Sequence, residues 1–335
     1  MATLENTSEV RERSCRSDRT SGPRPAVILA YVTCVLVWGT TWFAIRACMG
    51  PGGFHPFTAG TLRFLVATGI LALLWLAGFG RSGFSGARSL AWTTVAAVIG
   101  AISAALVYFA EQWVSGALAA IVNSTLPLMM AVVATFTGAE KVSRGSVIGC
   151  LIALAGIIVI FSDRLCVSSA QALGVGLLLF SVAISAINNV IVKRHTSRQH
   201  PIALSLIFNF IAIIVFACGS MICDRHVGSR PLPVVPVSAA IYLGIFGSAI
   251  AFSSYLYLIK HVSLMTVTTL VFFPPLIALC LDALLERQVV LSQASYAGIG
   301  ITLVGVAAAM LLPRPGQAGA LMQTVPEDQS SDQSL

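Results

Sequence analysis

The sequence has little charge, since only 10% of its 335 residues are Asp, Glu, Lys or Arg, whereas 57% are hydrophobic. A soluble domain carries about 25% charged residues, and a globule of this size could not cover its surface with so few. The composition therefore excludes a water-soluble fold and favours a protein embedded in a lipid bilayer.

Motifs that carry chemistry are scarce as well. The eight cysteines form no Cys-Xaa-Xaa-Cys pair, which argues against zinc or redox sites. The five histidines fall in connections or at span ends, and no predicted span has a carboxylate pair at its centre. A membrane metalloenzyme would need such ligands in a cluster, and an ATP-driven pump would need a GxxxxGK[ST] run, which is missing. We therefore expect no enzyme, no metal site and no cofactor.

Long apolar runs are what the sequence does contain. A helix needs about 20 apolar residues to cross the hydrocarbon core of a bilayer, and the prediction is an all-α membrane protein with ten transmembrane helices. The hydrophilic tails, 1–25 and 313–335, are expected to be disordered, and the first lacks the layout of a signal peptide. The predicted spans are 26–45, 57–79, 90–110, 115–137, 144–161, 172–192, 200–222, 237–259, 263–284 and 293–312.

The distribution of lysine and arginine predicts the orientation. With the N-terminus in the cytoplasm, the inner segments hold 14 of these residues and the outer segments hold five, while Arg63 lies within a span, which completes the 20. Because cytoplasmic connections are enriched in Lys and Arg, both termini are predicted to be cytoplasmic, with the chain in the cell inner (plasma) membrane. The net charge of +7 is then explained by topology and indicates no nucleic acid partner.

The chain aligns with itself at an offset near 148 residues, which predicts two units, 26–161 and 172–312. Each unit holds five spans, and because five is odd, the second unit would lie inverted in the membrane. Inverted repeats are typical of secondary transporters, which hold their substrate near the midplane between the halves. The alternative is that apolar helices resemble one another by composition. The matching positions are Pro127 with Pro275, and Gly149 and Gly156 with Gly298 and Gly305, the glycines one residue out of step.

Three stretches also resemble a known family. Residues 38–46 (Trp-Gly-Thr-Thr-Trp-Phe-Ala-Ile-Arg) resemble the WG(S/T)(S/T)xxxI motif of the drug/metabolite transporter superfamily, and residues 58–65, ending in Arg-Phe-Leu, resemble its second-helix run. Residues 115–156 resemble its fourth and fifth helices, with a proline in mid-helix and a Gly-Ala-Glu end at Glu140. The likeness is to EamA-type, PecM-like permeases and covers about 26–312.

This resemblance implies ten helices, a central cavity and transport of a small metabolite by export, and it names no substrate. The second half departs from the first at one position. Glu286 lies 11 residues after Pro275, whereas Glu140 lies 13 after Pro127, so no role is transferred to Glu286.

Prolines and polar side chains inside the spans are the candidates for substrate binding. A proline in mid-span removes a backbone hydrogen bond, and the freed carbonyls must face protein or a water-filled cavity. Pro127 and Pro275 are therefore predicted to break their helices beside the substrate. Polar and aromatic side chains near the midplane are predicted to line the cavity and bind the solute. They are Trp38, Tyr108, Asn123, Asn188 and Tyr255. The plainer alternatives are tolerated kinks and interhelical hydrogen bonds.

An outer gate is predicted around Arg63, which lies about 9 Å below the outer end of the second span, at 1.5 Å per residue. A charge at that depth is costly unless it is paired or wetted. Glu111 and Asp282 lie at similar height, at the outer ends of the third and ninth spans. An ion pair between Arg63 and either acid would close the outer side, whereas the alternative is that Arg63 snorkels to the headgroups or holds its helix in place.

Stripes of small residues predict close helix packing, either within the chain or in a homodimer through spans 5 and 10. The stripes are Gly145, Gly149 and Ala153 in span 5, and Ala294, Gly298 and Thr302 in span 10.

The predicted function is a secondary transporter, an exporter that moves a small organic metabolite or an amphiphilic drug by alternating access. The alternative is a membrane receptor or scaffold without transport activity. The expected partners are the small-molecule substrate and the lipid bilayer.

Overall fold

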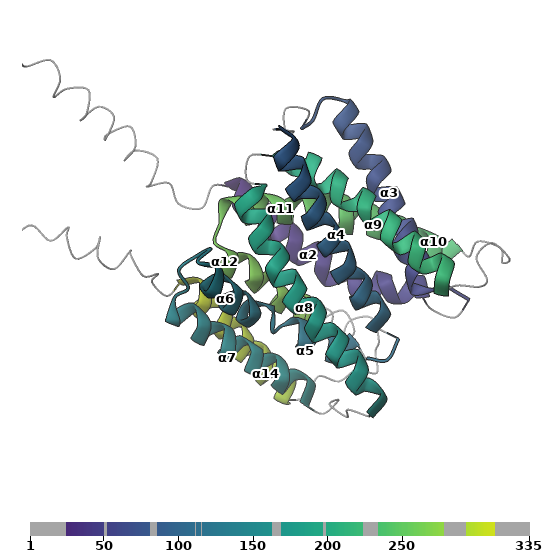
Figure 1. Ribbon diagram of the computed structural model, residues 1–335. Coiled ribbons are helices and arrows are strands. Elements are labelled where there is room, and N and C mark those ends of the chain that lie inside the picture. The colour runs from purple at the N-terminus through teal and green to yellow at the C-terminus, as the bar shows by residue number, and fades with distance from the viewer. Residues whose placement is uncertain are drawn as a thin grey trace, which may run out of the picture.

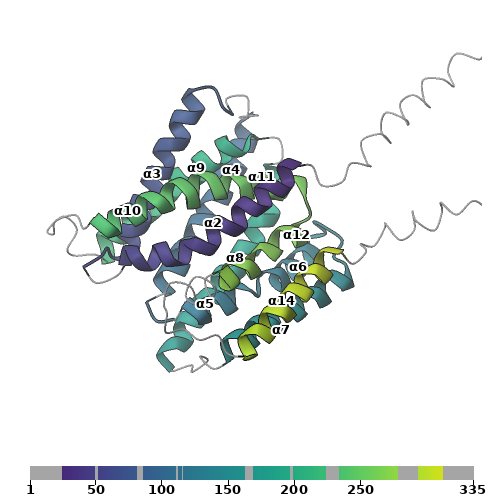
Figure 2. The same ribbon diagram turned by 180° about the vertical axis from the view of Figure 1, so that it is seen from behind.

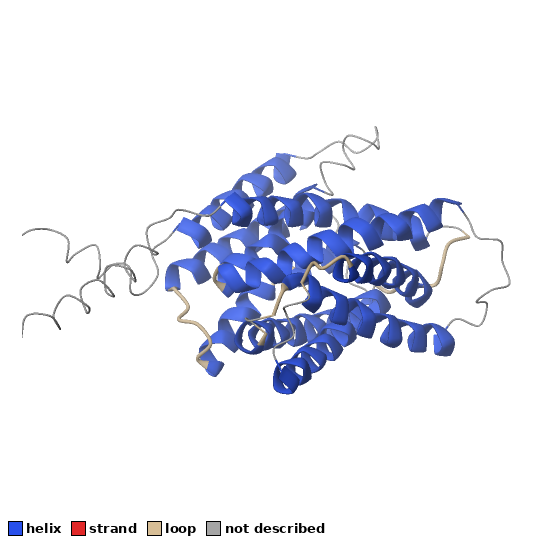
Figure 3. Ribbon diagram, turned by 90° about the horizontal axis from the view of Figure 1, so that it is seen from above, coloured by secondary structure: helices blue, strands red, loops and turns tan. Residues whose placement is uncertain are grey.

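The computed structural model describes residues 25–49, 52–80, 86–110, 112–114, 116–162, 169–196, 199–223, 234–277 and 293–311. These residues form helices joined by short turns, and no strand occurs among them, which confirms the all-α class for this part of the chain (Figure 3). Residues 1–24 and 313–335 of the predicted tails lie outside the described residues, and so do Glu111 and Asp282 of the predicted gate, whereas Pro25 is the first residue of a helix.

Within the described ranges, six helical runs of 21 to 28 residues are long and apolar enough to cross a membrane, since about 20 residues suffice. Five are single helices, and the sixth combines α10, the π-helix η3 and α11 without interruption. The single helices are α2 (Pro25–Met49), α3 (Pro56–Leu76), α4 (Gly86–Ala110), α8 (Ser169–His195) and α9 (Pro201–Cys223). The sixth run consists of α10 (Val234–Tyr242), η3 (Leu243–Ala251) and α11 (Phe252–His261).

The remaining apolar helices are shorter. They are α5 (Gly116–Asn123), α6 (Leu126–Thr137), α7 (Arg144–Phe161), α12 (Leu264–Thr268), the 3-10 helix η4 (Thr269–Phe272) and α14 (Gln293–Leu311). Large apolar side chains such as Phe136 and Leu73 are 88% and 69% exposed. Exposure of this kind over many helices is a liability in water and the expected outer surface in lipid. The chain is therefore a multi-pass membrane protein.

Both helices that carry a mid-span proline are interrupted. The fourth predicted span divides at Ser124 and Thr125 into α5 and α6, and Pro127 stands in the first turn of α6, where it has no backbone N–H to offer. In the ninth, α12 gives way to the tighter turns of η4 just before Pro274 and Pro275. The prolines thus lie where the α-helical hydrogen bonding breaks.

Helices α7 and α14 form a tightly packed antiparallel pair, which lies side by side at the edge of the bundle (Figures 1 and 2). A Cβ added at Gly149 would lie 2.3 Å from the backbone nitrogen of Ala309, and one at Gly156 would lie 2.8 Å from the carbonyl oxygen of Gly298. Only small residues allow backbones to approach so closely. The small-residue stripes are thus used within the chain, and a homodimer through the outward faces of these helices stays a prediction.

The rest of the bundle encloses the centre of the molecule. Helix α3 packs along α9, α4 packs along α8 and α9, and α2 packs along α10, η3 and α11. The α3–α9 contact depends on Gly60, because an added Cβ there would lie 2.2 Å from the ring of the buried Phe216. These packed pairs leave a cavity between them.

Candidate functional site

The centre of the bundle contains a cavity of about 350 Å³. Helices from both halves of the chain contribute to its wall. Five of the residues predicted to bind substrate line it: Trp38, Tyr108, Asn123, Asn188 and Tyr255. Pro127 and Pro275 are buried outside the wall, while Leu126 and Pro274, their chain neighbours, line it. The prolines therefore lie beside the cavity, near the breaks in their helices, rather than on its wall.

Four asparagines give the cavity hydrogen-bonding capacity: Asn123, Asn188, Asn189 and Asn209. The amide nitrogen of Asn209 donates to the carbonyl of Ser205 at 2.7 Å, and Asn189 hydrogen-bonds the hydroxyl of Tyr255. The side-chain oxygen Oδ1 of Asn188 is buried and has no hydrogen-bond partner. A buried acceptor without a partner costs about 1–3 kcal/mol, so it is suited to receive a donor from a solute.

Aromatic rings supply the apolar part of the wall. Trp38 and Tyr255 lie with ring centroids 5.1 Å apart, and Phe208 and Phe252 lie 5.5 Å apart. All four residues line the cavity. Gly100 leaves room beside them, because a Cβ there would lie 3.1 Å from both Phe208 and the amide nitrogen of Asn188. The cavity wall thus combines polar and aromatic side chains.

Arg63 of α3 is part of the cavity wall. Its Nε donates to the hydroxyl of Ser248 at 2.7 Å, and its Nη1 donates to the hydroxyl of Tyr108 at 3.0 Å. Among the described residues that line the cavity, Arg63 is the one charged side chain, and no Asp or Glu is present to neutralise it. Its predicted partners Glu111 and Asp282 lie outside the described residues, so the outer ion pair stays a prediction.

The π-helix η3, which the sequence did not predict, carries Ser248, one of the two hydroxyl partners of Arg63. Helices of this kind are rare and frequently found at functional sites. Gly244 and Gly247 let α3 approach it: a Cβ at Gly244 would lie 2.8 Å from the carbonyl oxygen of Arg63, and one at Gly247 would lie 3.3 Å from its Nη2. The sequence signal was the Gly-Xaa-Xaa-Gly-Ser run at 244–248, which marks a close backbone approach.

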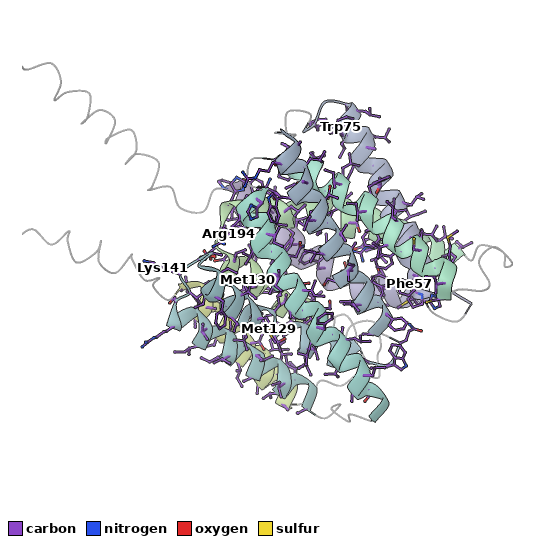
Figure 4. All side chains as sticks on the ribbon, in the orientation of Figure 1. Phe57, Trp75, Met129, Met130, Lys141 and Arg194 are labelled. Atoms are coloured by element: carbon purple, nitrogen blue, oxygen red, sulfur yellow. The ribbon has the colours of Figure 1, made fainter. Side chains whose placement is uncertain are left out.

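One end of the molecule is held together by hydrogen bonds from charged and polar side chains. Arg194 donates to the carbonyl of Thr137, and Lys193 donates to the carbonyl of Val262. Gln199 hydrogen-bonds two residues of α4. Its amide nitrogen donates to Ser89 Oγ at 2.6 Å, and its side-chain oxygen accepts from the hydroxyl of Thr93 at 2.8 Å. Figure 4 shows Arg194 at this end and Phe57 at the other.

The cavity extends toward the opposite end. Its wall reaches Ile45, near the end of α2, and Tyr108, near the end of α4. These positions lie within about 6 Å of the helix ends at 1.5 Å per residue. The cavity therefore reaches close to the end of the molecule that carries Phe57.

The sequence pattern of the EamA-like transporter family matches the chain twice, over residues 25–162 and 172–311. The chain belongs to the EamA-like transporter family. The family resemblance carried by residues 38–46 and 58–65 is thereby confirmed, and the matches cover both halves of the bundle that encloses the cavity.

Curated relatives of this EamA-like protein include two that are named as transporters and one that is not. The "Uncharacterized inner membrane transporter YedA" of Escherichia coli (strain K12) is 30% identical over 302 residues, which are 89% of this chain and 94% of the relative. An "Uncharacterized transporter" of Archaeoglobus fulgidus is 22% identical over 81% of this chain and 94% of that protein. "Protein PagO" of Salmonella typhimurium is 23% identical over 83% and 93%.

A solved crystal structure matches the EamA-like fold with a TM-score of 0.72 at 21% sequence identity, covering 87% of this chain and 98% of that chain. This likeness concerns the fold alone. Together, the family, the relatives' names and the apolar helices establish a membrane transporter. Within the described residues, no group of three or more His, Cys, Asp or Glu is placed to hold a metal ion.

Proposed function

We propose that this protein is a secondary transporter that carries a small organic solute through the central cavity by alternating access. The observation that carries the proposal is a cavity of about 350 Å³ lined by residues of both halves. The side-chain hydrogen bonds at one end of the molecule are proposed to close that end in this state. Ligand pockets have volumes of roughly 300–1,000 Å³, so the cavity fits a metabolite of modest size. The helix breaks near Pro127 and Pro275 supply local flexibility beside it.

The chemistry of the wall supports a solute with a carboxylate, a hydrogen-bond donor and an apolar body. Arg63 is an unneutralised cation among the described lining residues, and a guanidinium binds carboxylates well because its donors form a fork. Asn188 Oδ1 offers an acceptor without a partner, and Trp38 and Tyr255 offer an apolar surface.

Binding of paired solutes tests the substrate class. The purified protein would be screened by thermal shift against small aromatic and aliphatic carboxylates and against their primary amides, which keep size and remove the charge. A native-state ligand raises the melting temperature, so the acids should do so and the amides should not. Arg63→Gln should abolish the rise in melting temperature. Arg88→Gln is the control and should keep it, because it makes an equal charge change at an exposed position of α4. Equal shifts with acids and amides would exclude the carboxylate.

The two halves are proposed to be inverted repeats with ten crossings, and both termini to be cytoplasmic. The contact between α7 and α14 supports the inversion. These are the fifth helices of the two matched regions, and Gly149 faces Gly305 while Gly156 faces Gly298, so the helices run antiparallel. Two equivalent helices related by an axis in the membrane plane must run antiparallel. The excess of Lys and Arg in the proposed inner segments supports the orientation.

Cysteine labelling tests the orientation on a background without native cysteines. Ser229→Cys, in a proposed outer connection, should react with an impermeant reagent added to whole cells, and Ser197→Cys should react only in inverted vesicles. The opposite pattern would reject this topology. The same inverted vesicles test export: they should accumulate a labelled ligand found in the thermal-shift screen, and accumulation only in right-side-out vesicles would show uptake instead.

A further inference from the structure

A second cavity lies at the hydrogen-bonded end of the molecule, away from the central one. It is an open groove of about 770 Å³ between the first turns of α2, the start of α9, and α11 with the end of η3 that precedes it. The groove joins the halves, because α2 belongs to the first matched region and the other two helices belong to the second. It shares no lining residue with the central cavity.

The end of the groove is basic. Lys260, His200 and His261 line it, and no Asp or Glu occurs among the described lining residues. The ammonium of Lys260 donates to the carbonyl of Gln199, and because a lysine has three N–H donors, two remain. His200 Nδ1 accepts a hydrogen bond from the amide of Ile202 at 3.3 Å, which places the proton of the neutral ring on Nε2 as a further donor. This end is suited to bind an anion.

The rest of the groove is apolar at its rim and extends along the helices. Leu29 and Ile250 line it and are 68% and 42% exposed, on faces that lie in membrane-spanning runs and therefore meet lipid chains. From Ile250 to His261 the wall measures about 16 Å at 1.5 Å per residue. Ser253 lines the groove midway, and its Oγ is buried without a hydrogen-bond partner.

We propose that this groove binds an anionic phospholipid of the adjoining leaflet, with the phosphate at Lys260 and His200 and the acyl chains along Leu29 and Ile250. A basic pocket between membrane helices attracts anionic headgroups. A soluble anion would use the basic end alone, whereas a lipid also covers the exposed apolar rim and can place its glycerol ester oxygens within reach of Ser253. The site is independent of the solute in the central cavity, so either proposal can fail without the other.

Thermal shift of the detergent-purified full chain tests this site with three probes: short-chain phosphatidylglycerol, phosphatidylcholine of the same chain length, and inorganic phosphate. Phosphatidylglycerol should raise the melting temperature increasingly with concentration, and the other two should leave it unchanged. An equal shift with phosphatidylcholine would reject recognition of the anionic headgroup. An equal shift with phosphate would show a site for a soluble anion and overturn the lipid as occupant.

Variants locate the binding. Lys260→Gln should abolish the phosphatidylglycerol shift, and Lys141→Gln, an equal charge change at an exposed residue outside the groove (Figure 4), should keep it. Because Lys260→Gln also removes the bond to Gln199, Ala26→Trp provides a second variant. Ala26 is exposed at the rim, so a large ring there obstructs the groove without entering the core. A full shift in either groove variant would place the lipid elsewhere and overturn the proposal.

Discussion

The carboxylate Oε2 of Glu140 accepts a hydrogen bond of 2.7 Å from the backbone amide of Leu264. Glu140 follows α6 in the first half, and Leu264 is the first residue of α12 in the second half. The bond therefore joins the two interrupted helices at the closed end of the molecule. Arg194, which reaches the carbonyl of Thr137, lies beside the same junction.

Removing this carboxylate should loosen the closed end. A hydrogen bond to a charged group contributes about 1.5–3 kcal/mol, so Glu140→Ala should raise the population of the state open at this end by roughly 10- to 150-fold. The measurement is labelling of Ser185→Cys, a residue of the cavity wall, in inverted vesicles of a protein without native cysteines. Lys141→Ala, next in the chain and exposed, is the control and should label slowly. Equal labelling in the two variants would show that Glu140 does not hold the end closed.

A charge swap tests the outer gate. Arg63 is proposed to pair with Glu111 or Asp282 when the outer side is closed. Arg63→Glu alone should abolish transport, and combining it with Glu111→Arg or Asp282→Arg should restore part of it. If neither double variant recovers activity, Arg63 acts through its bonds to Ser248 and Tyr108 and holds α3 against η3 in every state.

The prolines are expected to matter for transport more than for folding. Replacing Pro127 or Pro275 by Ala restores a backbone donor and favours a continuous helix, which should slow transport several-fold while the protein still inserts and remains monodisperse. Transport rate and size-exclusion profile are the two measurements. Normal rates in both variants would mean that the interruptions in α5–α6 and α12–η4 have no part in transport.

The glycines of α7 and α14 should be required for stability. Gly149→Ala places a Cβ 2.3 Å from the nitrogen of Ala309, and overpacking of this kind costs about 1–3 kcal/mol. We expect a clear drop in melting temperature. Gly300→Ala is the matched control, because a Cβ there meets nothing within 4 Å, and alanine favours a helix over glycine. A loss of stability as large in Gly300→Ala would assign the effect to something other than the contact.

The helices and their interruptions were predictable because they depend on residues that are neighbours in the sequence. Apolar runs gave the predicted spans, and Pro127 and Pro275 gave the breaks. Polar groups and a deep indole inside a span need a polar surface, which predicted a cavity beside Trp38, Asn123 and Asn188. All three line the wall of the central cavity.

The partners of the charged residues were not predictable. The acids expected beside Arg63, Glu111 and Asp282, lie outside the described residues, so that pairing stays a prediction. Its bonds to two hydroxyls, those of Ser248 and Tyr108, have no mark in the sequence. Glu140, Lys193 and Arg194 bond to backbone groups, which every residue has, so no sequence pattern marks their partners. The π-helix η3 was not predictable for a related reason. Its wider turns depend on the close packing of α3 against Gly244 and Gly247, which is a tertiary contact.

The contacts between α7 and α14 have a consequence for the origin of the fold. Gly149 meets Gly305, and Gly156 meets Gly298. In the repeat, Gly149 corresponds to Gly298 and Gly156 to Gly305, so exchanging each glycine for its counterpart turns the first contact into the second. A surface with this property is complementary to a copy of itself. A half-length ancestor carrying one such helix could have formed the same contact with a second, oppositely inserted molecule, and joining the two genes would have preserved an interface that already existed.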